Sequence, residues 1–264
     1  MRNLFIIFTS LILSLCFGLG WTSENRAAYP LQEINQTAEI VPLPIVQDML
    51  TQVNQDRILT DLRRLSGAEP ICTSNGCTTL TGRFTESDNL QWAKDYVYET
   101  LVSLNYSLEV IDWTDTGLSD QDILAHKQGI LYPNEEIYFI AHLDGYPSNG
   151  PAADDDATGA VALLELARIL ENMHLSRSVT LFFSTGEEQG SVGSSYFVAH
   201  YPDRLDSIKY LVSVEMLGYD SNDDGRMELW SANDNTEFQQ LLSDMITAYP
   251  ASINLSPQIL TGCT

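Results

Sequence analysis

The sequence predicts an α/β fold with a largely parallel β-sheet and helices on both of its faces. Short apolar runs typical of strands alternate along the chain with longer segments of helical periodicity, and this alternation is typical of βαβ units. The 264 residues suit one large α/β domain or two small ones. Hydrophobic residues make up 44% of the chain and charged residues 19%, which are ordinary values for a globular protein.

The N-terminal residues 1–20 have the pattern of a signal peptide. Arg2 supplies a positive charge, residues 4–17 are mostly apolar, and Gly18 and Gly20 give the small-x-small spacing of a cleavage site. We therefore expect a secreted or periplasmic protein. The alternative is an uncleaved membrane anchor, which the short length of the segment disfavours.

A linker or pro-segment is expected over residues 21–44, because this stretch contains Pro30, Pro42 and Pro44 and has no sustained periodicity. The folded domain is then expected over residues 45–264. It begins with residues 45–65, whose apolar residues recur at helical spacing and predict helix.

A disulfide between Cys72 and Cys77 is predicted next. The two cysteines enclose a short polar turn with the dipeptide Asn75-Gly76, and export permits oxidation. Two free thiols are the alternative. Cys16 would leave with the signal peptide, so Cys263 remains without a partner.

The rest of the chain is read as alternating helices and strands. Ser87 or Asp88 can cap a helix that continues to about residue 104. Strands are predicted over residues 108–113, 137–141, 179–184, 210–216 and 227–230, and helices over residues 160–173, 192–200 and 238–248.

Polar side chains gather where predicted strands end, which is the edge of an α/β sheet that binds ligands. His142 follows the strand at 137–141, and Asp144 can accept a hydrogen bond from its imidazole N–H, leaving the second ring nitrogen for a metal. A structural histidine is the simpler interpretation of His142 alone.

Three further acidic clusters follow in order. Asp154, Asp155 and Asp156 precede the apolar helix at 160–173, and one helix cap does not account for three adjacent carboxylates that repel one another. Glu187 and Glu188 lie between two glycines after the strand at 179–184. Glu215 lies in a mostly apolar run, where a buried carboxylate needs a partner. The combined set of one histidine and several carboxylates suits zinc.

A calcium site is considered at residues 220–225, where Asp220, Asn222 and Asp224 have the spacing of the first half of a calcium loop. Ser231 stands at the twelfth position, where an EF-hand has glutamate. A turn rich in Asp and Asn is the preferred interpretation.

Four segments in this order resemble the co-catalytic zinc aminopeptidases, the twenty-eighth metallopeptidase family. They are A-H-L-D-G, P-A-A-D-D-D-A-T-G, S-T-G-E-E-Q-G and V-E-M-L-G-Y, and Leu80-Thr81-Gly82-Arg83 also fits the N-terminal part of the family. The resemblance covers the chain from about Val46 onward. It implies an αβα sandwich on a mixed, mostly parallel sheet.

The resemblance also implies roles for individual residues. His142 is similar to the histidine ligand of one zinc ion, and Asp144 to the carboxylate that orients it. Asp155 resembles the ligand that bridges two zinc ions, Glu187 the general base, and Glu188 a ligand of the second zinc. Glu215 matches a ligand position that is more often aspartate in the family.

One departure from the family concerns its last ligand, a histidine in a Tyr-His-Thr type motif near the C-terminus. The histidines of this chain are His126, His142, His174 and His200, and none follows Glu215. We therefore expect a chain truncated before the last ligand, which would also explain the unpaired Cys263.

The expected function is zinc-dependent exopeptidase activity on peptides or proteins, more specifically that of an aminopeptidase with two zinc ions. The alternatives are a non-catalytic ectodomain of the same fold and a one-zinc glutaminyl cyclase. With 13 basic and 36 acidic residues, the chain has a formal charge of −23, which argues against nucleic acids and anionic lipids as partners. A membrane becomes a partner only if residues 1–20 stay attached as an anchor.

Overall fold

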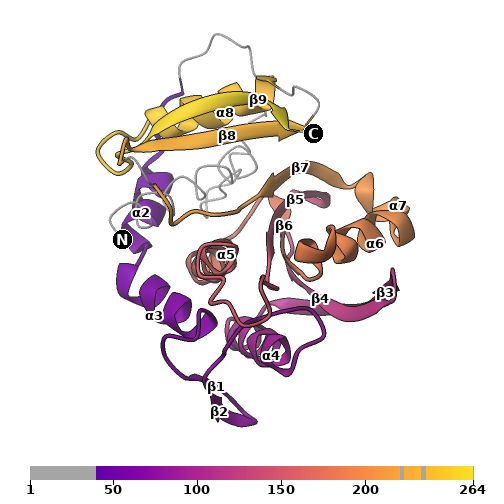
Figure 1. The fold of residues 1–264 in the computed structure, drawn as a ribbon. Helices are drawn as coiled ribbons and strands as arrows, with labels where there is room; N and C mark the ends of the chain where they lie inside the picture. The colour runs from indigo at the N-terminus through magenta and orange to yellow at the C-terminus, as the bar shows by residue number, and fades with distance from the viewer. Residues whose placement is uncertain (1–39, 221–222, 233–235, 264) are drawn as a thin grey trace. The chain divides into compact units, whose positions relative to one another are not determined.

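The computed structural model describes residues 40–220, 223–232 and 236–263, and the chain forms two compact units. The first unit is Asn54–Leu217, and the second combines residues 40–53 with residues from Gly218 onward (Figure 1). The predicted signal peptide and residues 21–39 of the predicted linker lie outside the described residues. The predicted domain boundaries stay predictions.

The first unit contains a five-stranded mixed sheet in the order β3-β4-β6-β5-β7. Its strands are β3 (Ser107–Asp115), β4 (Leu118–Lys127), β5 (Tyr132–His142), β6 (Arg177–Ser184) and β7 (Ile208–Ser213). Strand β4 is antiparallel to both β3 and β6, whereas β5 is parallel to both β6 and β7. The α/β class and the mixed sheet are confirmed, with parallel and antiparallel pairings in equal number.

Strand β4 is the element of this sheet that periodicity missed. Its buried side chains are a mixture, because Asp120 and Asp122 lie among the apolar residues Ile123, Leu124 and Ala125. Alternation of apolar and polar residues is the signal by which a half-buried strand is found. Carboxylates on the buried face of β4 remove that signal.

Helices cover both faces of this sheet (Figure 1). Helices α4 (Asp88–Ser103) and α5 (Ala157–Leu170) contact one face, and α3 (Gln55–Leu65) packs against α5. Helix α6 (Val192–His200), followed by α7 (Pro202–Leu205), covers the other face. The predicted αβα layering is therefore present in this unit.

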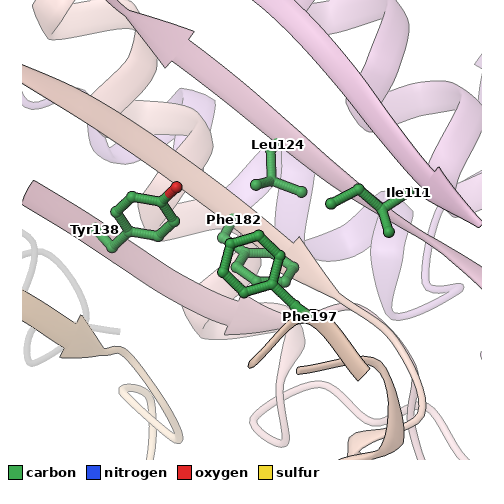
Figure 2. Close-up of a cluster of buried hydrophobic side chains, with 5 residues drawn as sticks. All are labelled: Ile111, Leu124, Tyr138, Phe182 and Phe197. Atoms are coloured by element: carbon green, nitrogen blue, oxygen red, sulfur yellow. The ribbon is translucent and has the colours of Figure 1, made fainter. Parts of the chain in front are cut away.

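The layer between the sheet and α6 has an aromatic core (Figure 2). Phe197 of α6 packs edge-on against Phe182 of β6, with ring centroids 5.2 Å apart, and lies 6.2 Å from the ring of Tyr138 on β5. Ile111 and Leu124 complete the cluster from β3 and β4. These contacts join four strands and one helix, so the cluster fixes α6 on the sheet.

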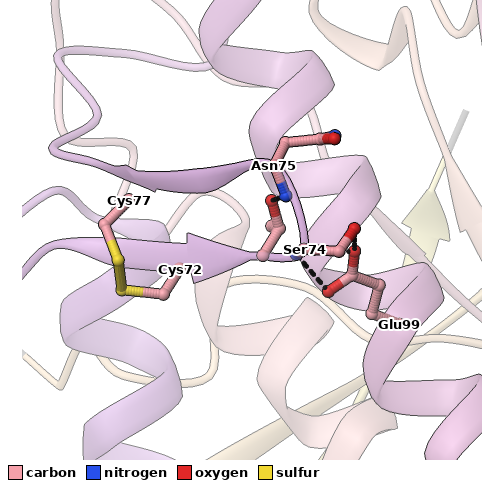
Figure 3. Close-up of a disulfide and its surroundings, with 6 residues drawn as sticks. Cys72, Ser74, Asn75, Cys77 and Glu99 are labelled. Carbon is pink, nitrogen blue, oxygen red and sulfur yellow. Dashed lines mark hydrogen bonds between the residues drawn. A yellow bond between two sulfur atoms is a disulfide. The ribbon is translucent and has the colours of Figure 1, made fainter.

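The predicted disulfide is present and closes a small hairpin (Figure 3). Cys72 of β1 (Ile71–Thr73) is directly opposite Cys77 of β2 (Gly76–Thr78), with the two Cα atoms 4.1 Å apart. The turn is held against α4, because the Ser74 N–H donates to the carboxylate of Glu99 at 2.9 Å. The disulfide therefore joins the two strands of the hairpin, and the hydrogen bond from Ser74 to Glu99 holds the hairpin against α4.

The second unit contains α2 (Pro44–Gln52), α8 (Thr236–Thr247) and two parallel strands, β8 (Arg226–Ala232) and β9 (Ser256–Cys263). The helix predicted over residues 45–65 is thus two helices. The chain is extended at Asn54, whose side chain caps α3 by accepting the Arg57 N–H at 3.0 Å. Within the described ranges, no helix is both long and apolar enough to cross a membrane.

Candidate metal centre

His142 is the last residue of β5, a strand with a parallel neighbour on each side. The carboxyl ends of parallel strands meet at one edge of a sheet, so the segments that follow β5, β6 and β7 lie together there. His142 is buried, and its Nε2 lies 3.0 Å from Oδ1 of Asp155. The structure therefore brings together a histidine and a carboxylate that are 13 residues apart.

Asp144 is fully buried and links this strand end to the next one. Its Oδ1 lies 3.6 Å from Nδ1 of His142 and accepts the Glu187 N–H at 3.2 Å, while its Oδ2 accepts the Glu188 N–H at 3.1 Å. The His142 ring also faces the Asp144 carbonyl oxygen at 3.2 Å. Asp144 thus lies beside the imidazole and holds the turn that carries both glutamates, and its function in orienting the ring stays a prediction.

The three consecutive aspartates have three different environments. Asp154 accepts the Thr158 hydroxyl at 3.2 Å, and Asp155 points its carboxylate toward His142. Asp156 caps α5, because its Oδ1 accepts the Gly159 N–H at 2.8 Å. Asp155 and Asp156 are joined by a cis peptide bond. The capping function therefore belongs to one of the three aspartates, and Asp155 is left for the centre.

Glu187 and Glu188 lie in a short 3-10 turn after β6, η1 (Glu187–Gln189). Glu187 accepts the Ser191 hydroxyl at 3.3 Å, and Glu188 accepts the Tyr146 N–H at 3.0 Å. Burial and the nearby charge of Asp155 raise the pKa of Glu188. Gly186 takes a positive φ of 75°, and a side chain on it would collide with the Trp113 ring.

The environment of Glu215 differs from the buried one that the sequence predicted. Strand β7 ends at Ser213, so Glu215 lies in the following segment and is exposed, not buried in an apolar run. Its carboxylate accepts the Ser213 hydroxyl at 2.8 Å. Its position beyond the carboxyl end of β7 places it at the same sheet edge as His142, and its function as a ligand stays a prediction.

The electrostatics of the His142 pocket suit a divalent cation. Burial lowers the pKa of His142, but the hydrogen bond to Asp144 and the charges of Asp156, Asp144 and Glu187 outweigh burial and raise the pKa to about 9. Burial also raises the pKa of Asp156 well above its usual range, and its Oδ2 is buried without a hydrogen-bond partner. Carboxyl groups therefore surround the His142 ring, and a zinc ion bound there would displace the imidazole proton.

The four predicted zinc ligands do not converge on a common point. In the part of the chain that the structure describes, no three His, Cys, Asp or Glu side chains converge as ion ligands. Of the four predicted ligands, His142 and Asp155 are in contact, while the carboxylates of Glu188 and Glu215 accept other hydrogen bonds. The residue types nevertheless fit zinc, since one imidazole and three carboxylates are ordinary donors for this ion.

Two buried ionisable residues that support the centre, Arg83 and Asp122, were assigned no function from the sequence alone. The guanidinium of Arg83 is fully buried and donates to the backbone oxygens of Leu143 at 2.8 Å and Ala152 at 2.9 Å, and burial lowers the pKa of Arg83 to about 10. Asp122 of β4 accepts the Thr185 N–H at 2.8 Å, directly before the Gly186 turn. Recognising β4 as a strand would have placed Asp122 on a buried face.

The candidate calcium loop is described only in part, because Asn222 lies outside the described residues. The Asp220 carboxylate accepts the N–H groups of Asp224 at 3.3 Å and Gly225 at 3.2 Å, and Asp224 accepts the Arg226 N–H at 3.0 Å. These contacts are those of an Asp-rich turn. Calcium binding stays a prediction.

Comparisons with known proteins agree with this arrangement. A probable zinc metalloprotease of Pyrenophora teres f. teres is 24% identical over 242 residues, which cover 84% of this chain and 50% of the relative. Aminopeptidase YwaD of Bacillus subtilis is 31% identical over 91 residues, which cover 34% of this chain and 20% of that protein. The chain therefore spans half the length of the first of these relatives, and less of the second.

Solved structures share the fold. The LapA aminopeptidase of Legionella pneumophila superposes with a TM-score of 0.64 at 17% identity, covering 89% of this chain and 62% of LapA. The glutaminyl cyclase of Macrostomum lignano also gives 0.64, at 16% identity, covering 86% of this chain and 76% of the cyclase. Fold alone thus does not distinguish peptidase from cyclase.

The model of Peptidase family M28 matches residues 123–258, which is more than half of the chain. The matched range extends from β4 to β9 and contains every predicted zinc ligand and the predicted base. With its mixed sheet, its buried histidine and carboxylates at one sheet edge, and this match, the chain belongs to Peptidase family M28, a family of hydrolases whose curated relatives here are zinc metalloproteases and aminopeptidases.

Proposed function

We propose that this protein is an exported aminopeptidase that binds two zinc ions through His142, Asp155, Glu188 and Glu215. The observation that carries the proposal is the contact between His142 and Asp155 at a sheet edge where Asp144 also holds both glutamates of the η1 turn. Export rests on the signal-like residues 1–20.

The chain's own residues divide the chemistry between them. Zinc held by His142 and the carboxylates would supply Lewis acidity toward a water molecule and the scissile carbonyl. Glu187 accepts the proton of the attacking water and returns it to the leaving amine, which requires a carboxylate within hydrogen-bond reach of both. The backbone of Glu187 is held by Asp144 and its side chain by Ser191, so the base has a defined position. Asp144 keeps the His142 ring oriented.

A glutaminyl cyclase is the second candidate, because the cyclase of Macrostomum lignano has the same TM-score as LapA. The Asp155 position favours the peptidase, since a carboxylate beside the histidine ligand can bridge two ions. Zinc analysis separates the two: the peptidase should hold about two ions per chain and the cyclase one. A single zinc together with cyclisation of an N-terminal glutamine would replace the peptidase proposal.

Glu187 and Glu188 provide a matched test, because they are neighbours of the same chemistry with different proposed functions. Glu187→Gln should keep zinc and lower turnover roughly 10²–10⁴-fold, the usual cost of a lost general base. Glu188→Gln should lose zinc and activity together, with partial recovery when zinc is added.

The measurements are peptidase turnover and zinc content of both variants in the protein as encoded in full. A Glu187→Gln protein that loses zinc, beside a Glu188→Gln protein that keeps it, would reverse the two assignments. Full activity of both variants would contradict the mechanism.

A further inference from the structure

The general base proposed at Glu187 is supported from two strands, β3 and β4, that carry none of the predicted zinc ligands. The turn that contains the base begins at Thr185, a buried residue directly after β6. The Thr185 N–H donates to Oδ1 of Asp122 on β4 at 2.8 Å, and the Thr185 hydroxyl lies 3.2 Å from the same oxygen. Asp122 thus binds the backbone two residues before the base.

Trp113 of β3 supports the same turn from the second strand. Its indole N–H donates to the Thr185 hydroxyl oxygen at 2.8 Å, and its ring lies so close to Gly186 that an added Cβ would be 2.8 Å from a ring carbon. Trp113 and Asp122 are both fully buried. Hydrogen bonds shielded from water are electrostatically stronger than those at the surface. We refer to Asp122, Trp113 and Thr185 as the turn anchor.

The chain beyond the base returns to the turn anchor. The Gly193 N–H, in the first turn of α6, donates to the Thr185 carbonyl oxygen at 3.1 Å. A Cβ on Gly193 would lie 2.6 Å from Oδ1 of Asp122, so α6 begins directly against this carboxylate. Residues 185–193 therefore form a loop whose two ends meet at Asp122, and Glu187 lies inside that loop.

The two glutamates of the loop depend on the turn anchor to different degrees. The Glu188 carboxylate accepts the Tyr146 N–H at 3.0 Å, which gives it a backbone contact outside the loop. The Glu187 carboxylate accepts the hydroxyl of Ser191, a residue of the same loop, at 3.3 Å. A shift of the loop would move Glu187 and Ser191 together, whereas the contact to Tyr146 would still hold Glu188.

We propose that Asp122, acting through Thr185, is a positioning residue that sets where the carboxylate of Glu187 stands for proton transfer. This inference rests on the proposed peptidase function. A general base must lie within hydrogen-bond reach of the proton that it takes, and a misplacement of about 1 Å can lower the rate roughly 10²-fold. Asp122 acts here as a hydrogen-bond acceptor, so an amide oxygen at this position should serve as well as a carboxylate.

The test measures hydrolysis of leucyl 4-nitroanilide by the zinc-loaded protein as encoded in full. Asp122→Ala should lower kcat roughly 10- to 100-fold and leave KM and zinc content near the wild-type values, because the base moves and the ligands stay. Asp122→Asn should recover most of kcat, since its amide oxygen accepts the Thr185 N–H. Thr185→Val, which loses the hydroxyl, should also lower kcat, and Thr185→Ser should retain it.

Asp61→Ala is the matched control, because Asp61 is a second buried aspartate of the same unit, with partners Tyr96 on α4 and Arg168 on α5. This variant should lose stability and keep kcat. Equal kcat in Asp122→Ala and Asp61→Ala would overturn the proposal, and so would loss of zinc together with activity in Asp122→Ala. Wild-type kcat in Thr185→Val would overturn it even if Asp122→Ala does not fold.

A measurement without turnover separates this inference from the peptidase proposal. Amide hydrogen exchange over residues 185–190, followed by mass spectrometry, should be faster in Asp122→Ala than in the wild type, Asp122→Asn and Asp61→Ala. If the wild type hydrolyses no anilide and this difference is found, the turn anchor stands and the peptidase function does not. Equal exchange in the four proteins would overturn the turn anchor whatever the activity.

Discussion

Carboxylates around the β5 and β6 strand ends have the same chemistry but different hydrogen-bond partners, and the partners decide their functions. Asp144 and Asp122 accept backbone N–H groups of the segment 185–188, Asp156 caps α5, and Asp155 faces an imidazole. A carboxylate that accepts backbone N–H groups fixes the chain locally. A carboxylate that faces a histidine at a sheet edge is available to a metal.

Asp122 has a testable effect on the pH dependence of stability. Burial raises its pKa from the ordinary 3.8 to about 7, although the Thr185 N–H and hydroxyl oppose the shift. An acid whose pKa is higher in the folded state destabilises the fold progressively as pH rises from about 4 to about 7, at up to about 1.4 kcal/mol per pH unit, and contributes no further slope above 7.

In Asp122→Asn this dependence should vanish, so the variant should gain stability relative to the wild type between pH 4 and 7. The measurement is the free energy of unfolding by denaturant at intervals of pH in the zinc-free protein. Asp112→Asn, at an exposed position on neighbouring β3, controls for the loss of one negative charge. Parallel stability profiles of wild type and Asp122→Asn would contradict the prediction.

At the scale of elements, the first turn of α5 is important because it carries the Asp156 cap and follows Asp155 directly. Gly159 in this turn approaches the segment after β7 closely: an added Cβ would lie 2.1 Å from the Val214 carbonyl oxygen and 2.3 Å from Oδ2 of Asp156. The absence of a side chain thus lets the helix approach the sheet edge.

Gly159→Ala should therefore destabilise the protein. Alanine gains about 1 kcal/mol over glycine in helix propensity, but overpacking against backbone costs about 1–3 kcal/mol, and the disturbed cap adds to that cost. Thermal unfolding should show a lower Tm than the wild type. Ser195→Ala, at an exposed position of α6, should leave Tm equal or slightly raised. A raised Tm for Gly159→Ala would contradict this prediction, because it would show that the space between Gly159 and the Val214 carbonyl oxygen accommodates a methyl group.

At the scale of the whole molecule, a formal charge of −23 is combined with carboxylates concentrated at one sheet edge. Like charges close together destabilise the folded state, and a divalent cation bound there relieves the repulsion. A ligand that binds only the folded state stabilises it by about 2.7 kcal/mol when its concentration is 100 times its Kd.

Removal of zinc by a chelator should accordingly lower Tm by roughly 5–10 °C in a protein of this size. Calorimetry with and without zinc at fixed ionic strength measures the shift, and fixed ionic strength excludes general screening. In His142→Ala the difference between the two conditions should be much smaller. A wild-type Tm that does not respond to zinc would contradict metal binding at this edge.

Local sequence determined most elements and the chemistry of the centre. Apolar periodicity predicted α4, α5, α6 and α8 to within a few residues, and Ser87 caps α4 as expected. The order of the His and carboxylate clusters indicated zinc and the family. These features are local, because helix caps and apolar faces are set by residues a few positions apart.

Tertiary structure decided what depends on residues distant in sequence. It placed β4 antiparallel between β3 and β6, which buries Asp122 beneath Thr185, and it put Arg83 among carbonyl groups up to 69 residues away. It ended β7 at Ser213, which exposes Glu215, and it set Tyr146 against Phe84. Strand pairing and the meeting of loops follow from the packing of the whole sheet, and no short-range pattern in the chain encodes them.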